Sequence, residues 1–343
     1  MSAPARRKPR SQRDPRHAPR PTPRPVAYHD DAPREGSRQF SDGSVAPVLL
    51  TSFDVSEYTR SVPGRIDVDT DRIEDQIDEA MEDPQGAGPR DLAELHRDLA
   101  FLHALESAAL TETRTMYSSW TANEARITAF LASWLWERHW WAHALEEILE
   151  TLPPGPAHGR RRPRPGAALR QVYVERALPI VGPGWTRVAG EAVTAGHMAR
   201  MAVQEGSLRA ALEALLHRVE HLPEVRRVLS EVIERRTHSL DFFHLEAIAR
   251  ITRSRAEAIT ARLVLAVGGD PLRPAGQRQA DEDISLPSIF RRSADRASLR
   301  SARYEITRLL PGPDAPGLLG PIRAIRRGIS QVTTPGGIDG LRP

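Results

Sequence analysis

Residues 123–152 have the sequence NEARITAFLASWLWERHWWAHALEEILETL and carry the clearest structural pattern in the chain. Apolar side chains recur there at intervals of three and four residues, which is the spacing of one face of an α-helix. Pro153-Pro154 follows, and proline is a strong signal for the end of a helix. The stretch therefore predicts an amphipathic helix with one apolar stripe: Ile127, Phe130, Leu131, Trp134, Trp141, Leu145 and Ile148.

Three other stretches show the same periodicity, and none of the chain has a convincing strand pattern. They are residues 90–119, residues 190–221 and a run that begins at Pro223 and continues past Ala247. Shorter patterns predict helices at residues 255–267 and 293–309, which would pack outside the long ones. Two pairs of long helices with one long connection are typical of a four-helix bundle. The sequence thus predicts an all-α bundle with one crossover and extra C-terminal helices.

The composition excludes several classes of protein. The chain has 343 residues, 40% of them hydrophobic, which is enough for a substantial core. It has no cysteine, and this rules out disulfides, thiolate metal sites and cysteine nucleophiles. The apolar runs are shorter than the ~20 residues of a membrane helix. We therefore expect a cytoplasmic protein without membrane insertion.

The composition also divides the chain into four regions. Residues 1–48 hold ten basic and five acidic residues with many prolines, and we expect this basic tail to be disordered. Residues 49–89 form an acidic lead-in, and residues 90–267 form the helical bundle. Residues 268–343 are expected to hold one helix and an irregular tail rich in glycine and proline.

The acidic lead-in contains alternating carboxylates at Asp67, Asp69 and Asp71, a spacing also found in calcium loops. The EF-hand pattern fails, because no glycine follows at the sixth loop position and no glutamate at the twelfth. We interpret the segment as an acidic helix start or as a surface that the basic tail can contact.

Each of the four apolar stripes is interrupted near its middle by one charged residue. These residues are Glu106, Arg138, Glu205 and Arg236. A single buried charge costs several kcal/mol, so it must be paired or must hold an ion. Two glutamates and two arginines sum to zero, which predicts a neutral cluster in the middle of the bundle. The alternative is that a helix is rotated and its charged side chain reaches the surface.

The four helices resemble the ferritin-like di-iron carboxylate proteins, and within them the acyl-carrier-protein desaturase branch. The string at residues 128–145, TAFLASWLWERHWWAHAL, is similar to that family's helix with Trp-x-x-Glu-Glu-x-x-His. Residues 101–106 (FLHALE), residues 197–205 (HMARMAVQE) and the run from Pro223 through Phe242-Phe243 resemble the other three helices. The resemblance implies a bundle whose di-iron site is bound by one Glu from each of two helices and by Glu-x-x-His from each of the other two.

The metal-ligand positions depart from that pattern. Carried over by the resemblance, the lone glutamates are kept as Glu106 and Glu205. The two Glu-x-x-His pairs become Arg138 with Trp141 and Arg236 with Ser239, or, after a shift by one residue, Arg235 with His238. Arginine has no lone pair to offer a metal. We therefore expect no metal or other cofactor, and ion pairs between the arginines and the glutamates instead.

Two histidine pairs offer a weaker alternative for metal binding. His139 and His143 share a helix face near Glu146 and Glu147, and His238 and His244 share one with Glu234 and Asp241. Both sets lie outside the apolar stripes, and we interpret them as solvated helix faces. An atypical iron or manganese site, if present, would use Glu106 and Glu205 first.

The sequence predicts a non-catalytic relative of the di-iron oxidoreductases that acts as a binding or scaffold protein, with a protein partner or a second copy of the chain. One alternative is an oxidoreductase of the desaturase or oxygenase type with iron or manganese at an atypical site. Another is a nucleic-acid accessory protein that acts through residues 1–48, in which case deleting this tail would remove binding and its salt dependence.

Overall fold

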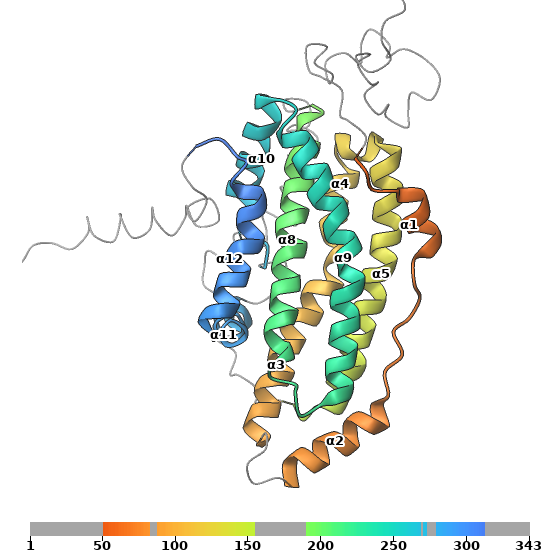
Figure 1. Ribbon diagram of the computed structural model, residues 1–343, viewed down its shortest axis with the longest axis vertical. Helices are drawn as coiled ribbons and strands as arrows, with labels where there is room; N and C mark the ends of the chain where they lie inside the picture. The colour runs from red at the N-terminus through yellow and green to blue at the C-terminus, as the bar shows by residue number, and fades with distance from the viewer. Residues whose placement is uncertain (1–50, 83–87, 155–189, 269, 273–278, 313–343) are drawn as a thin grey trace, which may run out of the picture.

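The structure is a computed structural model that describes residues 51–82, 88–154, 190–268, 270–272 and 279–312. These residues are mostly helical, with no strand among them, so the all-α prediction is confirmed (Figure 1). Nothing in the described part is a helix both long and apolar enough to cross a membrane. The basic tail (residues 1–48), the connection at 155–189 and residues 313–343 lie outside the described residues.

Three of the four long helices begin and end within a few residues of the prediction. They are α5 (Ala125–Thr151), α8 (Ala192–Leu216) and α9 (Pro223–Ile251). Pro223 begins α9, where its missing N–H costs nothing because the first turn has no intrahelical acceptor. Helix α3 (Pro89–Ser107) packs against α5, and α8 packs against α9 (Figure 1).

The single helix predicted for residues 90–119 is wrong. Helix α3 ends at Ser107, α4 (Ala109–Tyr117) follows after Ala108, and a 3₁₀ turn, η3 (Trp120–Asn123), leads into α5. The break shifts the helical phase, so that α4 buries Ala109, Thr113 and Met116. A continuous helix over residues 90–119 would have kept Leu110 and Tyr117 in its apolar stripe, but in the structure they are 56% and 40% exposed.

Helix α8 is covered on several sides, because the helices predicted to pack outside the bundle enclose it. Helices α10 (Arg255–Gly268) and α12 (Ser293–Thr307) both contact α8, in addition to α9. Glycine allows one close approach: a Cβ at Gly196 would lie 2.5 Å from Val264 Cγ2 of α10. The C-terminal region also holds a helix that was not predicted, α11 (Gln279–Ile289), which contacts α3.

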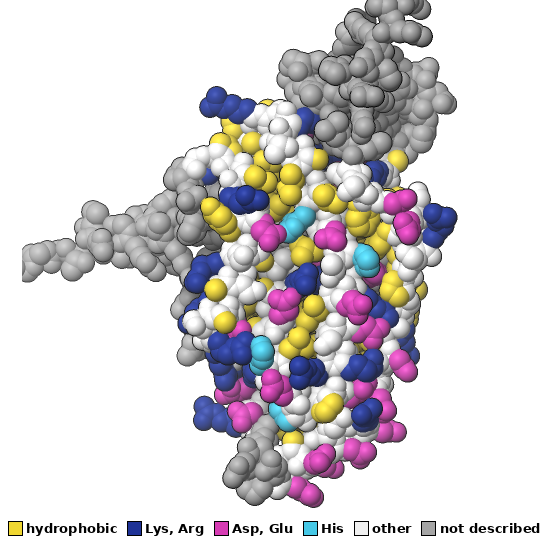
Figure 2. All heavy atoms as spheres, in the orientation of Figure 1, with side chains coloured by type: hydrophobic (Ala, Val, Ile, Leu, Met, Phe, Trp, Pro, Cys, Tyr) yellow, Lys and Arg dark blue, Asp and Glu magenta, His cyan; other side chains and the backbone are white. Residues whose placement is uncertain are grey.

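The acidic lead-in forms two helices, α1 (Val55–Ser61) and α2 (Thr70–Glu82). Helix α2 buries Ile73 and Ile77 in the same core as α5 and α9. Its outward face is acidic, and Figure 2 shows acidic side chains gathered at the end of the molecule where α2 lies. The exposed acids of this helix are Asp71, Glu74, Asp75, Asp78, Glu79 and Glu82.

The apolar core consists of two clusters at opposite ends of the long helices. One contains α5 residues from Trp141 onward and the first half of α9. The other contains α5 residues up to Trp134 and the second half of α9. The interrupting residues Arg138 and Arg236 fall between the two, in a polar layer that divides the core.

Candidate functional site: a buried Glu/Arg cluster

Four long helices each contribute one charged side chain to the polar layer. Glu106 lies in the last turn of α3, and Arg138, Glu205 and Arg236 lie near the middle of α5, α8 and α9. Glu106 is 1% exposed and the other three are fully buried. None of the four reaches the surface, so the rotated-helix alternative does not hold at these positions.

Each arginine bridges both glutamates. Arg138 Nε lies 2.5 Å from Glu106 Oε2, and Arg138 Nη1 lies 2.7 Å from Glu205 Oε1. Arg236 pairs with Glu106 Oε1 through Nη2 and with Glu205 Oε2 through Nη1. The result is a closed, neutral ring in which all four carboxylate oxygens face an arginine nitrogen. Charge-assisted contacts of this kind are the strong ones in a protein interior.

Arg138 also holds the break between α3 and α4. Its Nη2 donates to the carbonyl oxygens of Leu105, at 2.6 Å, and of Glu106, at 3.3 Å. The last carbonyls of a helix lack intrahelical donors and favour a nearby cation. Loss of Arg138 would therefore remove two ion pairs and the cap of α3.

Two tryptophans cover the arginines. The Arg138 guanidinium lies 5.1 Å from the Trp134 ring centre, and that of Arg236 lies 4.5 Å from the ring centre of Trp141. Cation–π contacts of this length stabilise a desolvated cation. Trp141, at a position where the resemblance implies a histidine ligand, thus packs on an arginine.

The register of α9 settles which of two neighbouring residue pairs faces the core. Arg236 and Ser239 are buried, whereas Arg235 pairs with Glu231 and donates to the carbonyl oxygen of Gly64, and His238 is exposed. The alignment shifted by one residue therefore does not describe the interior.

The electrostatics keep Arg138 charged. Burial alone would lower the pKa of Arg138, but the carboxylates of Glu106 and Glu205 outweigh it and raise this pKa. Glu112 of α4 is a further acid near Arg138, and burial raises the pKa of Glu112. Glu112 was not predicted as a site residue, because a continuous helix over residues 90–119 gives α4 the wrong helical phase.

A buried acid outside the ring, Glu137, also escaped the sequence analysis. The Tyr58 hydroxyl of α1 donates to Glu137 Oε2. Burial raises the pKa of Glu137 to about 7, with Glu205 adding to the rise and Tyr58 and Arg235 opposing it. Tyr58 lies in a short helix that shows no apolar periodicity, so nothing in the sequence indicated its contact with α5.

The Glu137→Gln variant tests this account of Glu137. The folded-state pKa is raised above the ordinary value of 4.5, so the folded chain binds more protons than the unfolded one, and stability falls as pH rises through 4.5 to 7. Glutamine does not titrate and still accepts a hydrogen bond from Tyr58, so the variant should not lose stability in this way. We expect its free energy of unfolding, relative to that of wild type, to rise by roughly 1–3 kcal/mol from pH 5 to pH 8.

The measurement is urea unfolding of both proteins at the two pH values. The matched control is Glu150→Gln, at an exposed position of the same helix, which should leave the difference between pH 5 and pH 8 as in wild type. An unchanged pH dependence in Glu137→Gln would contradict the assignment.

A second buried ion network joins the start of α5 to the end of α9. Arg250 Nη1 donates to Glu124 Oε1 at 2.9 Å, and Arg250 Nη2 lies 3.3 Å from Glu246 Oε2. Arg126 pairs with Glu246 and donates to the Phe53 carbonyl at 2.7 Å. One feature of the sequence could have indicated this network. Glu246 and Arg250 stand four residues apart, beside the apolar Phe243 and Ala247.

The histidines proposed as alternative ligands do not converge. His139 is exposed and His143 is half-buried, and both line a shallow groove with His103 of α3. His244 lies 3.4 Å from Glu305 of α12, while His238 points to solvent on α9. Within the described ranges, no three His, Asp or Glu side chains are placed to hold a metal ion together.

Comparison with protein-family models, with curated proteins and with solved structures gave no match. The donor set does not fit a di-iron centre, because such a centre needs oxygen and imidazole ligands and the ring offers two carboxylates already paired with two guanidinium groups.

Proposed function

We propose that the chain is a ferritin-like four-helix bundle whose di-iron centre has been replaced by ion pairs. In this proposal α3, α5, α8 and α9 are the four bundle helices. The protein acts as a non-catalytic binding or scaffold protein related to the di-iron oxidoreductases.

One observation carries the proposal. The two arginines stand at positions where the resemblance implies bridging glutamates, and each of them bridges Glu106 and Glu205. A glutamate changed to arginine alters the local charge by two units, so two changes alter it by four. The guanidinium groups supply the positive charge that a metal pair would otherwise supply, and their planar forks suit carboxylates.

An oxidoreductase with a single iron or manganese ion on Glu106 and Glu205 is the competing function. The ion would have to displace a guanidinium nitrogen from every carboxylate oxygen that it binds. It would also bring a double positive charge close to Arg138 and Arg236, which cannot lose their protons. Both costs argue against this function.

The metal content of the purified protein, expressed with iron and manganese supplied, tests the proposal. We expect less than one tenth of an equivalent of either metal in a folded, helical protein. Stoichiometric iron or manganese that is lost in Glu106→Ala would overturn the proposal. A surface-bound metal is recognised because Glu106→Ala leaves its content unchanged, whereas His139→Ala or His143→Ala lowers it.

A further inference from the structure

Helix α10 presents an apolar stripe on its outward side. Ala256, Ile259 and Leu263 stand at intervals of three and four residues, so they share one face of the helix. All three are exposed, Ile259 at 41% and Leu263 at 44%. The opposite side of α10 packs against α8 and α9. The stripe therefore leaves two large apolar side chains in contact with water.

The described chain ends beside this stripe, and Figure 1 shows the end of α12 near α10. Arg262, the neighbour of Leu263 in α10, donates from Nη1 to the carbonyl oxygen of Pro311 at 2.5 Å. At Gly312 a Cβ would lie 2.9 Å from the guanidinium carbon of Arg262, and φ is +104°, which favours glycine. The backbone is thus held against α10 at the point where residues 313–343 continue.

One stretch of this C-terminal segment has a regular apolar spacing. Residues 320–329 have the sequence GPIRAIRRGI, in which the isoleucines stand at i, i+3 and i+7: Ile322, Ile325 and Ile329. This is the spacing of one helix face, and Pro321 after a glycine suits the first turn of a helix. Three arginines stand between the isoleucines, so the stretch is typical of a short amphipathic helix with one apolar side.

The two apolar stripes have the same pattern and the same length. Ala256, Ile259 and Leu263 also stand at i, i+3 and i+7, which corresponds to about 10 Å along a helix axis. The connection at residues 313–320 can span up to about 26 Å, far enough to reach any point of a stripe beside which it begins. A short tether keeps the segment at about millimolar effective concentration, so a weak apolar contact is sufficient.

We propose that residues 321–329 form an amphipathic helix that docks its apolar side on the stripe of α10. Docking covers Ile259 and Leu263 and leaves Arg323 and Arg327 on the side away from α10. A second copy of the chain is a poorer occupant, because a stable interface between two proteins buries about 800 Å² on each partner and this stripe offers two large apolar side chains. The docking does not depend on the proposed function, because the stripe lies outside the cluster.

The rate at which a single cysteine reacts with N-ethylmaleimide tests the docking, since the chain has no cysteine of its own. Ile259→Cys in the full-length chain should react slowly. Adding Ile322→Gln and Ile325→Gln removes the apolar side of the segment and should accelerate the reaction at least about 10-fold. The matched control in the segment, Arg323→Gln with Arg327→Gln, alters its other side and should leave the slow rate unchanged.

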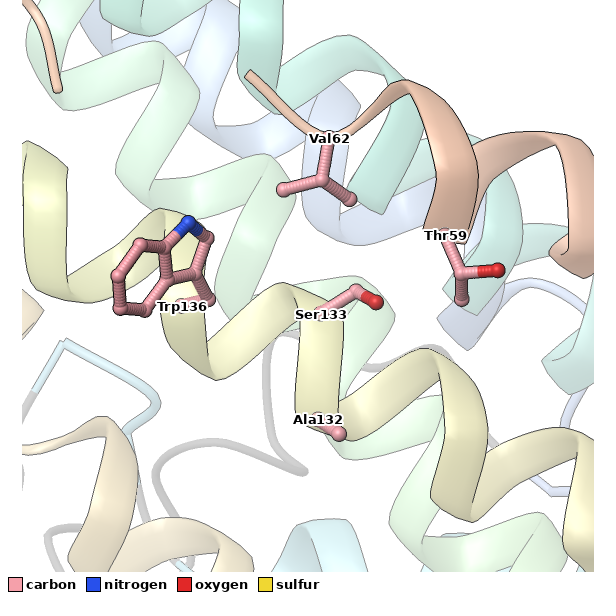
Figure 3. Close-up of a pocket in the computed structure, with 5 residues that line it drawn as sticks. All are labelled: Thr59, Val62, Ala132, Ser133 and Trp136. Carbon is pink, nitrogen blue, oxygen red and sulfur yellow. The ribbon is translucent and has the colours of Figure 1, made fainter. Parts of the chain in front are cut away.

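A second cysteine position shows whether the effect is local to α10. Ala132→Cys lies at an exposed position of α5, in a shallow groove between α1 and α5 (Figure 3). Its rate should be the same with the wild-type and the altered segment. Equal rates for Ile259→Cys with the two segments would overturn the proposal. A slow rate that only dilution raises would assign the stripe to a second copy of the chain, which overturns it too.

Hydrogen exchange of the unmodified chain tests the segment itself. When docked, the amides of residues 321–329 should exchange at least about 10-fold more slowly than in a synthetic peptide of residues 313–343, which has no α10 to bind. Exchange at the same rate in the chain and in the peptide would contradict the docking, whatever the rate at Ile259→Cys.

Discussion

Arg138→Glu is expected to lower the free energy of unfolding by more than about 5 kcal/mol, which is enough to unfold a domain of ordinary stability. The change would leave three buried carboxylates around the single guanidinium of Arg236, and it would remove the cap that Arg138 provides for α3. Breaking one buried ion pair already costs about 3–5 kcal/mol. Here two pairs are lost and a like-charge contact is added. Urea unfolding followed by circular dichroism measures the effect.

Two controls show whether the loss comes from the buried charges. Arg226→Glu makes the same change at an exposed position of α9 and should cost less than about 1 kcal/mol. The double variant Arg138→Glu, Glu106→Arg returns the cluster to zero net charge and should regain part of the loss. A stable Arg138→Glu protein without added metal would contradict the ion-pair account.

Arg250→Met should produce the second large effect, a loss of about 3–5 kcal/mol at pH 8. Methionine keeps much of the volume but leaves Glu124 without its cation, and Glu246 with Arg126 alone. Burial already raises the pKa of Glu124, while Arg250 opposes the rise. Without Arg250 this pKa climbs further, so Glu124 takes up a proton more readily. We therefore expect a smaller loss at pH 5 than at pH 8.

The matched control for Arg250→Met is Arg226→Met, at an exposed position of the same helix. A surface substitution of this kind should change the free energy of unfolding by less than about 1 kcal/mol. Equal losses in the two variants, or a loss that does not change between pH 5 and pH 8, would show that the second network does not depend on Arg250 as described.

The sequence predicted the four cluster residues because each of them interrupts an apolar stripe. At Glu205, for example, Met201 and Ala202 stand four and three positions before it and Leu208 stands three positions after it, so the carboxylate falls within the apolar stripe that faces the core. Proline likewise predicted the C-terminal end of α5, at Pro153, and the start of α9, at Pro223. Periodicity works here because one helix phase holds over more than twenty residues.

Features of the fold that lack a long apolar period could not be predicted from the sequence. The break at Ala108 depends on Arg138, which is distant in sequence, and the phase of α4 and the burial of Glu112 follow from that break. Tyr58 lies in a short helix and Glu124 lies at a helix boundary, so neither residue interrupts an apolar stripe. Helix α11 contains Pro287, and proline is disfavoured inside a helix. In each case, contacts between distant segments decide the outcome.

An anomalous-scattering measurement tests the central claim most directly. Crystals grown from protein expressed with iron and manganese supplied would be measured on both sides of the iron and manganese absorption edges. The account predicts no anomalous peak among Glu106, Arg138, Glu205 and Arg236, and continuous density for both guanidinium groups between the carboxylates. A peak within bonding distance of Glu106 and Glu205, with either arginine turned away, would contradict it.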